Sequence, residues 1–82
     1  MIKKSIVLNS VSDVKSFVNI VNEYPFEIDL ISGRYVVDGK SIMGIFSLDL
    51  KQPITCCIRA ESTDERAAQL LERLSGYIED RS

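Results

Sequence analysis

The sequence predicts an α+β fold, an open-faced β-sandwich in which a four-stranded antiparallel sheet is covered on one side by three helices. Segments with strand-like and helix-like hydrophobic periodicity alternate along the chain in the order β-α-β-β-α-β-α. Each helical segment has one apolar face, and a single sheet can cover all of them. Charged residues at alternating strand positions, Glu27, Asp29 and Arg59, indicate that the other face of the sheet is solvated. At 82 residues the chain is expected to form a single domain over residues 1–82.

The first strand is expected at residues 3–8, and the first helix follows it. Ser10 or Ser12 can cap this helix, and Asp13 lies in its first turn, where a negative charge suits the helix dipole. Pro25 ends the helix, because the residue before a proline is driven away from helical angles. The apolar face has helical spacing and consists of Val14, Phe17, Val18 and Val21.

Two short strands are expected next, as an antiparallel pair. Residues 26–30 alternate apolar and charged side chains, which is typical of a half-buried strand. Residues 32–34 form a turn, residues 35–37 form the third strand, and Asp38-Gly39 is a second turn signal. The side chains expected to face the core from the second strand are Phe26, Ile28 and Leu30.

A short helix is expected after Ser41, which can act as its N-cap. Ile42, Ile45 and Phe46 are spaced for one face of this helix, whereas Met43 falls off that stripe and is expected to be more exposed. A helix of about two turns has little intrinsic stability and must be held by packing. Because it cannot bury all its apolar side chains, we expect Ile45 and one other to lie in the core and the rest to form an exposed patch.

The fourth strand is expected at residues 54–60, with Cys56 and Cys57 on opposite faces and one of them in the core. A disulfide between adjacent strand residues would be strained, and two cysteines are too few ligands for a metal site. The last helix is expected to start at a capping box over residues 62–65, with Ser62 as the cap. Its apolar stripe consists of Ala67, Leu70, Leu71, Leu74, Tyr77 and Ile78.

The composition argues against several classes of function. Net charge is −2 and no basic stripe is present, so we expect no nucleic-acid binding. The sequence has no apolar run long enough for a membrane span and no secretory signal, so we expect no membrane association and a cytoplasmic location. The carboxylates are scattered, with no pair placed for general acid–base chemistry. We therefore expect no metal, no cofactor and no enzymatic activity.

The run Gly-Lys-Ser-Ile-Met-Gly-Ile-Phe-Ser-Leu at residues 39–48, together with the order of elements, resembles the HPr family. These are the small phosphocarriers of the bacterial phosphoenolpyruvate-dependent sugar phosphotransferase system. The resemblance covers nearly the whole chain, and its most specific part is the run Lys-Ser-Ile-Met-Gly at residues 40–44. It implies the same open-faced β-sandwich that the hydrophobic pattern predicts.

The sequence departs from the HPr family at the start of the first helix. There the family has a phosphate-accepting histidine, closely followed by an arginine and a proline, but residues 9–14 contain none of these and the chain has no histidine. A carrier needs a nitrogen that forms a labile phosphoramidate, whereas a serine phosphate ester is far too stable to pass on. Asp13 would also repel an incoming phosphoryl group. We therefore expect an HPr-like protein that is unable to carry phosphohistidine.

Many relatives carry a serine at the start of the short middle helix that a dedicated kinase phosphorylates, and Ser41 occupies the matching position. The catabolite-repression HPr proteins lack the histidine and keep this serine, and their serine-phosphorylated form binds a transcription repressor through the middle helix. The resemblance thus implies a regulatory or adaptor protein with Ser41 as its phosphorylation site. The implied protein partners are an HPr kinase and a transcription repressor, and the implied partner-binding residues are Lys40, Ile42, Met43 and Phe46.

Other interpretations stay open at this point. Ser41 can be an N-cap and nothing more. Ser10 and Ser12 can be helix caps or can form an anion site, since hydroxyls and unsatisfied N–H groups converge at that helix start. The order of elements also fits a small-molecule or anion-binding domain of the ferredoxin-like type. The short helix after the third strand discriminates between the two folds, because the ferredoxin-like fold does not require it.

Overall fold

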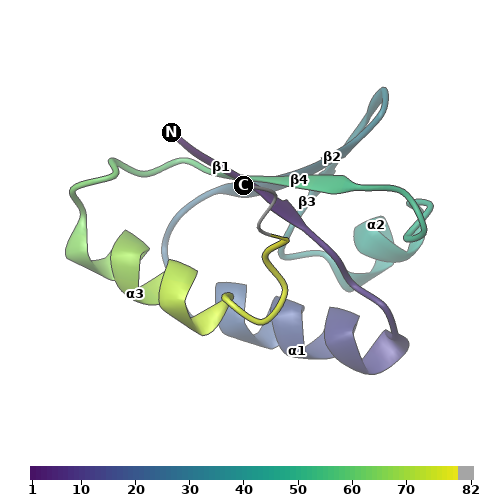
Figure 1. Ribbon diagram of the computed structural model, residues 1–82, viewed down its shortest axis with the longest axis horizontal. Helices are drawn as coiled ribbons and strands as arrows, with labels where there is room; N and C mark the ends of the chain where they lie inside the picture. Colours follow the sequence, from purple (N-terminus) through teal and green to yellow (C-terminus); the bar gives the residue numbers. More distant parts are fainter. Residues whose placement is uncertain (80–82) are drawn as a thin grey trace.

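The alternating strand and helix segments fold into one antiparallel sheet with all three helices on the same side (Figure 1). The computed structural model describes residues 1–79. In chain order the elements are β1 (Ile2–Ile6), α1 (Val11–Val21), β2 (Ile28–Ser32), β3 (Tyr35–Asp38), α2 (Ile42–Phe46), β4 (Ile54–Ile58) and α3 (Glu65–Arg73). The strand order is β1-β4-β2-β3, which leaves β1 and β3 at the edges. The predicted open-faced β-sandwich is confirmed.

Alternation along the strands separates a buried face of the sheet from an open one. On the buried face Ile28 of β2 lies opposite Ile58 of β4, and both side chains are in the core. On the open face the guanidinium of Arg59 donates to the carboxylate of Asp29 at 3.2 Å and lies 3.6 Å from that of Glu27. The charged side chains expected on the solvated face are therefore there, and they pair with one another.

The first helix contributes its predicted apolar face to the core. Val14, Phe17 and Val21 are fully buried, and the ring of Phe17 meets the ring of Tyr77 edge-on, with centroids 6.2 Å apart. Ser10, not Ser12, is the N-cap, because its hydroxyl accepts the N–H of Asp13. The other fully buried large side chains of the core are Ile6, Leu8, Ile28, Leu30, Ile45, Ile54, Ile58, Leu70 and Leu74.

The last helix differs from its prediction at both ends. It begins at Glu65 with Asp64 as the N-cap, whose carboxylate accepts the N–H groups of Arg66 and Ala67, so the expected cap at Ser62 is wrong. Asp64 caps the helix in place of Ser62 because its carboxylate accepts two of the N–H groups that the first turn leaves unsatisfied. The helix ends at Arg73, well before Tyr77 and Ile78.

A turn, and not the helix, packs these two half-buried residues against the core. After α3 the chain turns back toward β1, where Ile78 forms a bridge with Ile6 and the carbonyl of Tyr77 accepts the N–H of Val7 at 2.8 Å. Their spacing continues the helical stripe only by coincidence. No helix within residues 1–79 is long and apolar enough to cross a membrane.

The strand boundaries also differ by a few residues from those expected. β1 starts and ends earlier than residues 3–8, β4 ends at Ile58, and β2 begins only at Ile28. Phe26, expected inside the second strand, lies before it, where its ring is half-buried and stacks on Tyr24 with centroids 6.4 Å apart. Tertiary packing determines where each strand begins and ends, and the hydrophobic periodicity of the sequence does not report it.

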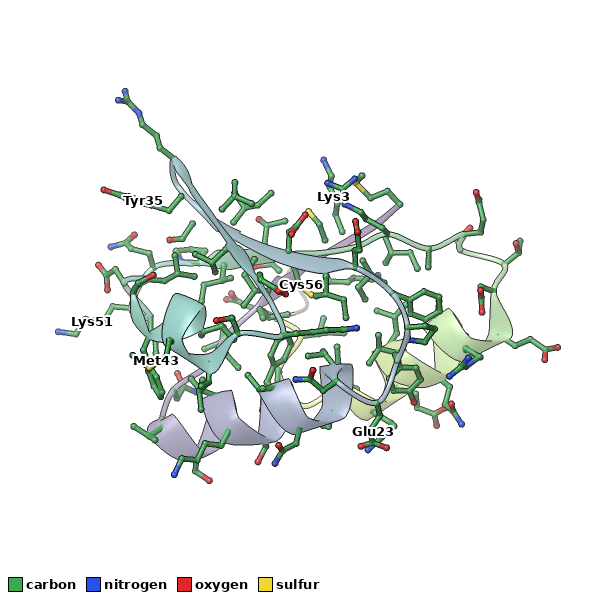
Figure 2. The ribbon with its side chains drawn as sticks, turned by 180° about the vertical axis from the view of Figure 1, so that it is seen from behind. Lys3, Glu23, Tyr35, Met43, Lys51 and Cys56 are labelled. Atoms are coloured by element: carbon green, nitrogen blue, oxygen red, sulfur yellow. The ribbon has the colours of Figure 1, made fainter. Side chains whose placement is uncertain are left out.

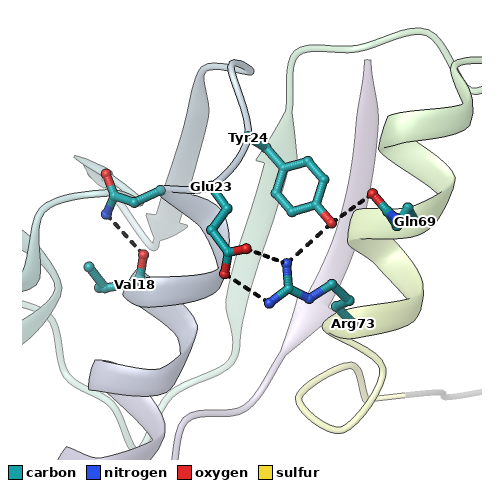
Figure 3. Close-up of polar contacts among 6 residues, drawn as sticks. Val18, Glu23, Tyr24, Gln69 and Arg73 are labelled. Atoms are coloured by element: carbon teal, nitrogen blue, oxygen red, sulfur yellow. Dashed lines mark hydrogen bonds and ion pairs between the residues drawn. The ribbon is translucent and has the colours of Figure 1, made fainter.

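The C-terminal end of α1 is tied to α3 by a polar cluster (Figure 3). The guanidinium of Arg73 donates to both carboxylate oxygens of Glu23, at 3.1 and 2.9 Å, and lies 3.4 Å from the hydroxyl of Tyr24. That hydroxyl lies 3.1 Å from the amide oxygen of Gln69. The hydrogen bonds from Arg73, reinforced by its charge, hold the pKa of Glu23 below its ordinary value.

This lowered pKa predicts a stabilising contribution that acid removes. Because the folded-state pKa of Glu23 lies below the unfolded one, the contribution is complete above the unfolded value and is lost as the pH falls through the folded value. Glu23→Gln should therefore lower the urea midpoint at pH 7 and lower it less near about pH 3. The matched control is Glu72→Gln, an exposed residue of α3 without an ion pair in the described chain. An equal loss for Glu23→Gln at both pH values would contradict the argument.

Candidate functional site

Ser41 lies where the chain leaves β3 and enters α2. Its backbone is extended, with φ −103° and ψ 111°, and its hydroxyl accepts the N–H of Gly44 at 3.1 Å. Its carbonyl accepts the N–H of Ile45 at 3.1 Å, so that main-chain bond also fixes the first turn. Ser41 is thus the N-cap that the sequence predicts, and its side chain is half-buried.

Lys40 is engaged with the end of α1. Its ammonium donates to the carbonyl of Tyr24 at 2.6 Å, and its own carbonyl accepts the side-chain amide of Asn22 at 3.3 Å. Its N–H donates to a carboxylate oxygen of Asp38 at 2.8 Å. These three contacts fix the residue before Ser41 from two directions. Partner binding by Lys40 stays a prediction, and the geometry gives its side chain a positioning role as well.

The apolar side chains of α2 divide into two that pack inward and two that do not. Ile45 is fully buried, and Ile42 packs against the core from its margin. Met43 is 76% exposed and Phe46 is 40% exposed, and Figure 2 shows Met43 at the surface of α2. The sequence predicted that Ile45 and one other side chain would be buried and that Met43 would be exposed, whereas Phe46, on the same predicted stripe as Ile42 and Ile45, is exposed. We call Met43 and Phe46 the α2 patch.

The start of α1 is closed by its own side chains. The hydroxyl of Ser10 accepts the N–H of Asp13, and the carboxylate of Asp13 in turn accepts the N–H of Asn9, both at 3.0 Å. Ser10 thus caps the helix, and the carboxylate of Asp13, bonded to the residue before the cap, places a negative charge at the helix start. Ser12 is exposed in the first turn and is not the cap. The structure therefore gives no support to an anion site at Ser10 and Ser12.

The two cysteines are free and buried. Cys56 belongs to the core cluster, whereas Cys57 lies on the other side of β4. Burial, with a smaller effect of the neighbouring Cys57, raises the pKa of Cys56 to about 12, so its thiol stays protonated and unreactive. Residues 1–79 contain no group of three or more side chains that could hold a metal ion.

The sequence profile of the PTS-HPr family, described as the phosphorylation site of the PTS HPr component, matches residues 13–80. The chain belongs to the HPr family. Proteins of this family are phosphocarriers of the phosphotransferase system and not enzymes. A comparison with curated proteins gave no match.

Solved structures of HPr-family proteins have the same fold. HPr-C-His from Thermoanaerobacter tengcongensis matches with a TM-score of 0.71 at 23% identity, over 90% of each chain. HPr from Bacillus anthracis str. Ames matches with a TM-score of 0.68 at 24% identity, over 95% of this chain and 96% of that one. Crh, the catabolite repression protein of Bacillus subtilis, crystallised as an intertwined dimer with a swapped domain; it matches with a TM-score of 0.62 at 21% identity, over 92% of this chain and 88% of that one. At these identities the likeness shows the fold alone.

Membership in the HPr family makes the start of α1 informative. The family profile begins to match at Asp13, within the segment of residues 9–14 in which the family's phosphate-accepting histidine is expected, and this chain has no histidine at any position. The short helix α2 after β3 is present, and this feature separates the HPr fold from the ferredoxin-like one. Sequence reasoning missed Asn22 and Tyr24, which hold Lys40, because no local pattern reports a contact across 16 residues or more.

Proposed function

We propose that this HPr-like protein is a regulator or adaptor of the sugar phosphotransferase system that cannot carry phosphohistidine. It docks protein partners through α2, with Ser41 as a phosphorylation switch. The observation that carries the proposal is the α2 patch, which lies exposed beside the cap serine on a scaffold without histidine. An HPr kinase, a transcription repressor and a cytoplasmic location belong to the same proposal.

The start of α1 supports the loss of carrier chemistry. A phosphoryl group in transit needs a nucleophilic nitrogen and an environment that accepts negative charge. Here the helix start already holds the carboxylate of Asp13, which accepts the N–H of Asn9 at 3.0 Å. An incoming phosphoryl group would meet this charge, and the nearby hydroxyls of Ser10 and Ser12 would form esters too stable to pass on.

The start of α2 supports a role for Ser41 in recognition. A phosphate on Ser41 would lie at the N-terminal end of α2, where unsatisfied N–H groups favour negative charge. It adds roughly −1.5 to −2 charges next to Met43 and Phe46 without requiring a different fold. The modified surface would then combine an apolar patch with a strong local charge. A partner with an apolar pocket beside basic side chains fits such a surface.

Phosphorylation by an HPr kinase with ATP tests the proposal. We expect intact-mass analysis to show one added phosphate, and fragmentation to place it on Ser41. Ser41→Ala should abolish the modification. Ser47→Ala is the matched control because Ser47 lies at the other end of α2, where it is exposed and its hydroxyl donates to the carbonyl of Gly44 at 2.5 Å. This variant should still accept phosphate.

The same mass assay tests the loss of carrier function. With phosphoenolpyruvate and the first enzyme of the phosphotransferase system, we expect no added phosphate, because the chain has no histidine. A labelled protein in this second arm would contradict the regulatory assignment. A protein that the kinase leaves unmodified, or modifies equally in Ser41→Ala, would remove the switch from the proposal.

A further inference from the structure

The two edge strands of the sheet, β1 and β3, differ in how far the rest of the chain covers them. At the β1 edge, the N–H of Val7 donates to the carbonyl of Tyr77 and the N–H of Glu79 donates to the carbonyl of Ser5, both at 2.8 Å. The returning chain therefore covers part of that edge. At the opposite edge, β3 pairs only with β2 within the described part of the chain. The carbonyl of Asp38 accepts the N–H of Ser41 at 3.1 Å, and no strand of the described chain covers the rest of this edge.

β3 lacks some of the features that protect edge strands, although it is short, at four residues, and ends in the charged Asp38. Tyr35 and Val36 are 72% and 61% exposed, and the strand contains neither lysine nor proline. Figure 2 shows Tyr35 near the outer end of the β2–β3 hairpin, away from α1 and α3. An exposed apolar edge of this kind is a template for pairing with another strand.

The turn before β3 determines which main-chain groups point outward. Gly33 and Arg34 form a two-residue loop, and the φ of +59° at Gly33 matches the turn type that has glycine at its first central position. Such a loop places Tyr35 and Ser32 in a hydrogen-bonded pair. Alternation along an antiparallel ladder then directs the N–H and C=O of Val36 away from β2. Val36 is therefore at the centre of the open edge.

Charges are placed symmetrically around Val36. Arg34 lies two residues before it and Asp38 two residues after it, and neither forms an ion pair within residues 1–79. Asp38 also lies opposite Asp29 on β2, whose carboxylate pairs with Arg59 at 3.2 Å. Like charges on opposing strand positions are unfavourable. One carboxylate oxygen of Asp38 accepts the N–H of Lys40 at 2.8 Å, and a cation from outside the chain would balance the remaining charge.

We propose that β3 is a self-association edge, on which two copies of this chain pair antiparallel about a two-fold axis at Val36. In this register the N–H of each Val36 donates to the carbonyl of the other, and Arg34 of each copy faces Asp38 of its partner. The segment from Arg34 to Asp38 is thus self-complementary in charge, which selects a second copy over an unrelated peptide. Because β3 has only four residues, the contact is small, and the dimer is weak and sensitive to salt.

Sedimentation velocity and amide NMR over a concentration series test this edge. We expect the sedimentation coefficient to rise toward millimolar concentration, with chemical-shift changes concentrated at residues 34–38. Arg34→Asp should weaken self-association roughly tenfold or more, because it sets like charges opposite each other. Lys51→Asp is the matched control, since it reverses the charge of another exposed residue outside β3. It should leave association unchanged.

A mixture of two variants that restores the pairing of position 34 with position 38 distinguishes a lost interface from a loss of folding. Asp38→Arg should also associate poorly alone, but an equimolar mixture of Arg34→Asp and Asp38→Arg should associate again. In the mixed dimer the aspartate introduced in one copy faces the arginine introduced in the other, and the second pair of positions keeps its native residues. Circular dichroism verifies that each variant is folded. A wild-type chain that stays monomeric, shifts centred on α2, or a mixture that fails to associate while both variants are folded would overturn the proposal.

Discussion

Replacement of Phe17 by alanine is expected to reduce the free energy of unfolding by about 4 kcal/mol. Phe17 is fully buried on α1, and its ring meets that of Tyr77 edge-on at 6.2 Å, so truncation leaves a cavity and removes an aromatic pair. At roughly 0.05–0.15 kcal/mol per residue, a domain of this length has a total stability of about 4–12 kcal/mol. The variant should therefore keep about 0–8 kcal/mol of stability and unfold at a much lower urea concentration than the wild type. Urea denaturation followed by circular dichroism measures the loss.

The matched control makes the same substitution on the α2 patch. Phe46 is 40% exposed, so Phe46→Ala should cost less than about 1 kcal/mol of stability. If the patch docks a partner, Phe46→Ala should instead weaken capture of that partner by the Ser41-phosphorylated protein. A loss of stability at Phe46 as large as that at Phe17 would mean that Phe46 is a core residue and would remove half of the proposed docking surface.

The sequence predicted the layers of the fold because buried side chains recur at the repeat of the helix or strand that carries them. Val14, Phe17 and Val21 repeat with the helix, and all three are fully buried as expected. The same reasoning extended α3 too far, because Tyr77 and Ile78 keep helical spacing while a turn carries them back to β1. Periodicity reports that a side chain is buried but not which backbone conformation buries it.

The candidate site was predictable only in its local part. Ser41 as a cap and Met43 as an exposed side chain follow from residues within one turn of each other, and the structure has both. The contacts that fix Lys40 come from Asn22 and Tyr24, which are distant in sequence. Ser10 was a candidate cap and Asp13 a first-turn charge in the sequence, but only the structure shows that Asp13 accepts the N–H of Asn9 at this helix start.

Substitution of Gly39 by alanine is expected to reduce stability by about 2 kcal/mol, although the side chain added is a single methyl group. A Cβ at Gly39 would lie 2.7 Å from a methyl carbon of Ile28 and 3.1 Å from its carbonyl oxygen. The N–H of Gly39 donates to that same oxygen at 2.7 Å, so the chain cannot move away without losing the bond. Thermal and urea unfolding measure the loss.

Gly76→Ala is the control, because a Cβ there would meet nothing within 4 Å and its φ is not positive. That variant should be neutral or gain up to about 1 kcal/mol, since alanine has fewer unfolded conformations. The comparison also bears on function. Ile28 fixes Gly39, and Tyr24 fixes Lys40, so together they set where Ser41 begins α2. Gly39→Ala should therefore slow phosphorylation of Ser41 even where the variant is folded. Unchanged phosphorylation would show that the kinase recognises the Ser41 segment without this support from the fold.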